Sequence, residues 1–94
     1  MFDPRTLYPF DWDGLTESVR RTGRLVVVDD ANRTCGIAAE VIATMAERVR
    51  LAAPPVRVTR PDGAVLPFSI ELDRATQPSR AQLAAAVALT VKER

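Results

Sequence analysis

An acidic pair directly after an apolar run is the feature of this sequence that comes nearest to a reactive site. Residues 25–28 read Leu-Val-Val-Val and are followed by Asp29 and Asp30. Ligands of open α/β sheets bind at the carboxyl ends of strands, where paired carboxylates can hold Mg²⁺, as in a phosphoreceiver domain. Such a site also needs an aspartate after a second strand and a lysine on a later strand. The next run, 56–59, ends without an aspartate, and Lys92 falls in a helical pattern. The sequence therefore favours two solvated loop acids that cap or pair.

The loop after this pair offers a generic anion site. Arg33 and Thr34 precede a helical pattern, and a helix N-terminus presents free backbone N–H groups. Thr34 equally suits the N-cap, and Gly36 suits either close approach of a ligand or a packing position. A possible contact with an anion or a protein partner is therefore predicted at Asp29, Asp30, Arg33, Thr34 and Gly36.

The sequence lacks the residues that most other kinds of reactive site need. The chain has no histidine, so the single cysteine, Cys35, has no base to make it a catalytic thiol, and no His/Cys metal site can form. No GxGxxG, P-loop or nucleophile elbow is present. Thirteen basic and twelve acidic residues are scattered along the chain, which speaks against nucleic-acid binding. No signal peptide or membrane span is apparent, and one cysteine fits a reducing compartment, so we expect a cytoplasmic protein. The sequence predicts no catalytic, cofactor-binding or metal-binding residue.

The length and patterning predict one α/β domain over residues 1–94. Helices are expected after Asp11, over about 35–51 with Thr34 as cap, and after Ser79. Gly23 ends the first helix, strands are expected at 25–28 and 56–59, and residues 2–8 form a short extended segment. The buried stripe of the second helix comprises Ile37, Ala38, Val41, Ile42, Met45 and Val49. This alternation predicts a three-layer α/β/α domain with a mostly parallel sheet.

Three segments, read together, resemble one protein family. Residues 4–11 resemble its D-L-R-T-L-x-P-[LF]-D segment, and residues 22–29 with 33–40 resemble its strand, loop and helix. Residues 53–59, followed by Asp62 and 66–68, resemble its A-P-x-x-R-V-T-x-x-D-x-P-x-P-[FY] segment. The family is the C-terminal domain of the beta subunit of thiamine-diphosphate-dependent 2-oxo acid dehydrogenases (pyruvate, branched-chain or acetoin type), a transketolase C-terminal-like domain. The resemblance runs in order along essentially the whole chain.

The resemblance implies that this chain is a domain of a larger enzyme and has no active site of its own. In the family, other domains hold thiamine diphosphate and Mg²⁺, whereas this domain supports the subunit interface and helps dock the acyltransferase core. It implies a non-catalytic assembly domain or small subunit of an enzyme that oxidatively decarboxylates a 2-oxo acid. The alternative, from another class, is an independent binding module that uses residues 29–36 to bind an anion or a protein.

Two departures from the family bear on partners. Family domains begin one strand and one helix earlier, so a strand at this edge would lack its neighbour and expose backbone groups. We therefore expect association, as a dimer or with other chains of such an enzyme, through the large side chains Phe2, Leu7, Tyr8, Phe10 and Trp12. Ala52 stands where the family often has an acid that contacts the acyltransferase, which speaks against docking in the usual way.

Overall fold

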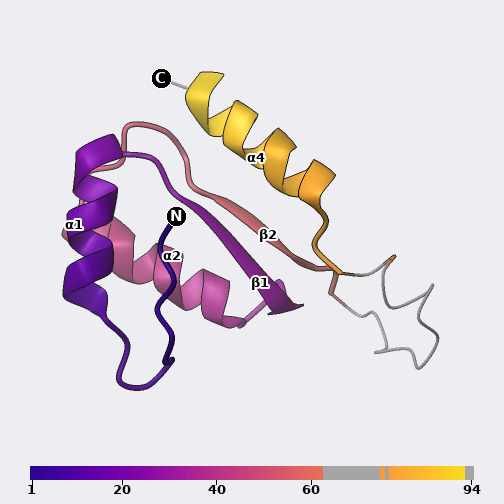
Figure 1. Ribbon diagram of the computed structural model, residues 1–94, viewed down its shortest axis with the longest axis horizontal. Coiled ribbons are helices and arrows are strands. Elements are labelled where there is room, and N and C mark those ends of the chain that lie inside the picture. The colour runs from indigo at the N-terminus through magenta and orange to yellow at the C-terminus, as the bar shows by residue number, and fades with distance from the viewer. Residues whose placement is uncertain (63–74, 76, 93–94) are drawn as a thin grey trace.

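The computed structural model describes residues 1–62, 75 and 77–92 (Figure 1). Its elements are α1 (Trp12–Thr22), β1 (Val26–Asn32), α2 (Ile37–Arg48), β2 (Val56–Arg60) and α4 (Arg80–Lys92). β1 and β2 pair in parallel, with Val26 opposite Val56 and Val28 opposite Val58. Because α2 connects them, the three elements form a β–α–β unit.

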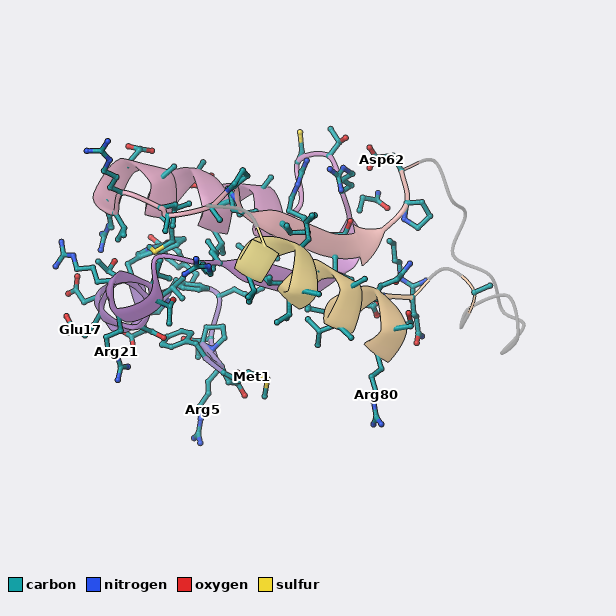
Figure 2. All side chains as sticks on the ribbon, turned by 90° about the horizontal axis from the view of Figure 1, so that it is seen from above. Met1, Arg5, Glu17, Arg21, Asp62 and Arg80 are labelled. Carbon is teal, nitrogen blue, oxygen red and sulfur yellow. The ribbon has the colours of Figure 1, made fainter. Side chains whose placement is uncertain are left out.

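Three layers stack around this two-stranded sheet. Figures 1 and 2 show α2 on one face of the strands and α4 on the other. Both helices contact both strands, and α1 packs beside α2. The three-layer α/β/α fold class with a parallel sheet is thus confirmed for the part of the chain that the structure describes.

The first helix begins and ends where the sequence predicts. The carboxylate of Asp11 accepts a hydrogen bond from the Gly14 amide at 3.0 Å, which satisfies one of the free N–H groups of the first turn. Gly23 ends α1 in the left-handed region, with φ 69°, and its amide donates to the Val19 carbonyl oxygen. Ser79 caps α4 in the predicted position: its hydroxyl accepts from the Gln82 amide, and the Gln82 side chain accepts from the Ser79 amide.

The prediction for the second helix is wrong at both ends. Thr34 is not its cap: Gly36 is the N-cap residue, and it makes no side-chain cap hydrogen bond. Between them Cys35 has φ 59°, so the chain is still turning where the helix was expected to start. At the other end Val49 is extended, and α2 stops at Arg48 rather than near Leu51.

Residues 1–11, all of which the structure describes, form no strand. The extended segment predicted at 2–8 is therefore not a sheet strand. The remaining motif residues of the third resembling segment, 66–68, lie outside the described residues.

The main core lies between α1, α2 and the α2-facing side of β1. Its buried residues are Leu15, Val19, Leu25, Val41 and Met45. Met45 is completely buried, and Ala38 is as well. The predicted stripe of α2 is thus confirmed at Ala38, Val41 and Met45, whereas Ile37, Ile42 and Val49 are partly buried against the same cluster.

Candidate functional site

The acidic pair lies within β1, not in the loop after it. β1 continues to Asn32, so both Asp29 and Asp30 have strand positions. Asp30 is the partner of a buried cation: its Oδ1 accepts a hydrogen bond from Arg60 Nε at 2.6 Å, and the Arg60 side chain is only 7% exposed. The predicted loop position is therefore wrong for both residues, whereas Asp30 is paired, as predicted, and its side chain stays 66% exposed. Its contact joins β1 to β2.

Asp29 lies on the opposite face of β1 from Asp30. Its Oδ2 atom is buried, and within the described part of the chain no hydrogen bond to that atom is found. The nearest feature is the start of α2, since a Cβ built on Gly36 would lie 3.7 Å from this oxygen. A helix N-terminus favours a carboxylate beside it.

The Thr34 donors that the sequence predicts for an external anion bind the carboxylate of Asp62 instead. The Thr34 amide donates to Asp62 Oδ1 at 2.8 Å, and the Thr34 hydroxyl donates to the other oxygen of the same carboxylate. Figure 2 shows Asp62 just past the end of β2. Arg57 Nη1 donates to the Arg33 carbonyl oxygen at 2.8 Å and fixes the same loop. The structure therefore brings Arg33 and Thr34 together with Asp62, which the sequence did not indicate as a partner.

These contacts lower the pKa of Asp62 below its ordinary value of 3.8, chiefly through the Thr34 hydroxyl and amide and then through Arg33. Because the pKa is lower in the folded state, the carboxylate stabilises the fold at pH values above its pKa in the unfolded chain. This stabilisation is lost as the pH falls through the pKa of the folded state. We expect the Asp62 carboxyl carbon, followed by NMR, to titrate below 3.8 in the wild type and closer to 3.8 in Thr34→Val. Identical titration in both proteins would contradict this assignment.

A cavity of about 460 Å³ lies between the N-terminal segment, α1, α2 and β1, with Leu83 of α4 at its margin. Six successive residues, 24–29, line it, as do five residues of the N-terminal segment: Met1, Phe2, Pro4, Leu7 and Phe10. Most of its lining is apolar, and Asp29 is its acidic residue. It lies at the end of the molecule where the sequence predicts association.

The structure divides the predicted association residues into two groups. Phe2, Phe10 and Trp12 are partly buried against the core, and the rings of Phe10 and Trp12 stack with centroids 4.2 Å apart. Leu7 and Tyr8 are 61% and 96% exposed. The first group thus serves the fold of this chain, whereas Leu7 and Tyr8 are free to contact another molecule.

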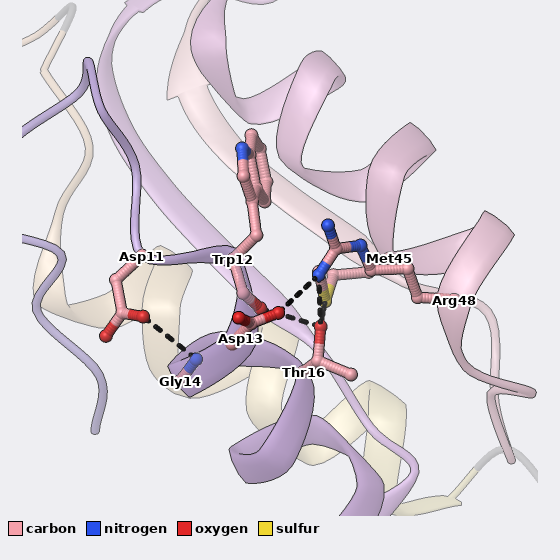
Figure 3. A network of polar contacts seen from close by, with 7 residues as sticks. All are labelled: Asp11, Trp12, Asp13, Gly14, Thr16, Met45 and Arg48. Atoms are coloured by element: carbon pink, nitrogen blue, oxygen red, sulfur yellow. Dashed lines mark hydrogen bonds and ion pairs between the residues drawn. The ribbon is translucent and has the colours of Figure 1, made fainter.

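A polar network that the sequence did not suggest ties α1 to α2 (Figure 3). The hydroxyl of the buried Thr16 donates to the Trp12 carbonyl oxygen at 2.7 Å and lies beside the sulfur of Met45. Arg48 Nη1 donates to the same hydroxyl oxygen at 3.3 Å and to Asp13 Oδ1 at 3.2 Å. The contacts of Arg48 with Asp13 and Thr16 thus link α2 to α1.

Neither a metal-ligand cluster nor a membrane-spanning helix is found among the described residues. In that part of the chain, no group of three His, Cys, Asp or Glu residues could hold a metal ion. None of the helices described is long and apolar enough to cross a membrane.

Comparison with known proteins identifies relatives over the whole chain. Residues 1–83 match the family model "Transketolase, C-terminal domain". The subunit beta of acetoin:2,6-dichlorophenolindophenol oxidoreductase from Cupriavidus necator is 43% identical over 91 residues, which are 96% of this chain and 27% of that protein. The subunit beta of the pyruvate dehydrogenase E1 component from Bacillus subtilis is 46% identical over 69 residues, 71% of this chain and 21% of that protein. The chain thus spans about a quarter of the length of these relatives.

Proposed function

The chain belongs to the transketolase C-terminal domain family, and from this premise we propose that it is a non-catalytic assembly domain of a thiamine-diphosphate-dependent 2-oxo acid dehydrogenase. In this proposal it forms the end of a beta-type subunit or works as a small subunit beside the chains that hold the cofactor. The single cysteine supports the cytoplasm as its compartment.

The observation that carries the proposal is the extent of the match. Forty-three per cent identity extends over 96% of this chain, yet it covers only 27% of the acetoin oxidoreductase subunit. The matched part of that subunit is therefore one domain of a larger polypeptide. A domain of this kind contributes packing surface, and the described residues of this chain include an ion pair between a buried arginine and an exposed aspartate and polar contacts between α1 and α2.

The surface that supports association is the N-terminal end. Leu7 and Tyr8 are exposed beside the cavity, and several nearby residues are apolar. Covering about 300 Å² of apolar surface would favour association by several kcal/mol before the entropic cost of binding, at roughly 25 cal/mol per Å². We propose that this end contacts either a second copy or another chain of the enzyme.

The binding-module alternative finds less support. It needs the donors of residues 29–36 to be free for an anion, but the Thr34 amide and hydroxyl both bind Asp62. Docking of an acyltransferase in the usual way also lacks the acidic residue that the family often has. The exposed residue Ala52 stands at that position. Purification of the tagged chain from its native host separates the two functions. Co-purifying thiamine-diphosphate enzyme chains support the proposal, whereas a lone homo-oligomer supports the module.

The isolated chain is expected to bind no thiamine diphosphate and to decarboxylate no 2-oxo acid, because the resemblance assigns the cofactor to other domains. Isothermal titration calorimetry with thiamine diphosphate and Mg²⁺ checks this directly. The intact enzyme, assembled from all its chains, serves as the positive control. Micromolar binding to the purified 94-residue chain would contradict the proposal.

A further inference from the structure

We draw no further inference here: the strongest candidate, the outer face of α4 with its exposed side chains Val87, Leu89 and Val91, carries none, because nothing in the part of the chain that the structure describes shows what covers it.

Discussion

Replacing Met45 with alanine is expected to lower the free energy of unfolding by about 2–5 kcal/mol, as other deletions of large buried side chains do. Met45 is fully buried in the cluster that joins α1, α2 and β1, and its sulfur lies beside the Thr16 hydroxyl. The alanine variant leaves a cavity at the point where the two helices meet. Because a small domain has only about 5–15 kcal/mol of stability, much of the chain should be unfolded at 37 °C. Urea unfolding followed by circular dichroism measures the effect.

Two variants serve as controls for Met45→Ala. Met45→Leu keeps the volume and should cost less than about 1.5 kcal/mol. Val27→Ala removes a side chain that is only partly buried in this chain, so its effect should be smaller than that of Met45→Ala. If Met45→Ala and Met45→Leu melt at the same temperature, the described core is not what stabilises the domain.

Gly36→Ala is expected to destabilise the domain by about 1–3 kcal/mol, the usual cost of inserting an atom where none fits. A Cβ at this position would lie 2.2 Å from the Asn32 carbonyl oxygen, which is backbone and cannot rotate away. The loop between β1 and α2 must therefore shift, and with it the Thr34–Asp62 contact.

The control for Gly36→Ala is Gly14→Ala. There the Cβ would displace the Asp11 carboxylate and weaken its cap hydrogen bond, a loss that the gain in helix propensity of alanine over glycine largely offsets. We expect its thermal midpoint to stay near that of the wild type. If the Gly36→Ala protein is as stable as the Gly14→Ala protein, the loop after β1 has space for a Cβ atom that the structure does not show.

Local signals were sufficient for the parts of the fold that the sequence predicts correctly. Asp11, Gly23 and Ser79 act through partners within four residues, so capping rules identify them without tertiary information. The parallel strands follow from the two runs rich in β-branched residues at 25–28 and 56–59: β1 begins one residue into the first run, at Val26, and β2 contains the second.

Long-range partners account for what the sequence could not predict. Thr34 is a plausible cap by spacing, but its hydroxyl is taken by Asp62, 28 residues later. β1 continues through Asp30 because a buried cation, Arg60, lies on the neighbouring strand 30 residues away. The pattern of charges along the sequence does not show which residues pair. The pairing depends on how the strands lie next to one another in the folded chain.

The resemblance supplied the family, and the structure adds a cavity beside the N-terminal segment. The sequence predicts five association residues, of which Phe2, Phe10 and Trp12 turn inward in this chain. The cavity is lined by the N-terminal segment, α1, β1 and α2. No periodicity argument reveals such a hollow, because it depends on how far the N-terminal segment lies from the strand.

Sedimentation of the purified chain at low micromolar concentration tests most directly whether this is an assembly domain. The account predicts species heavier than the 10.3 kDa monomer, or binding of an apolar dye that is lost when the chain joins its enzyme partners. Association is expected because Leu7 and Tyr8 are exposed and Leu7 lines the largely apolar cavity at the same end of the molecule. A single 10.3 kDa species with a cooperative melt and no dye binding would contradict it.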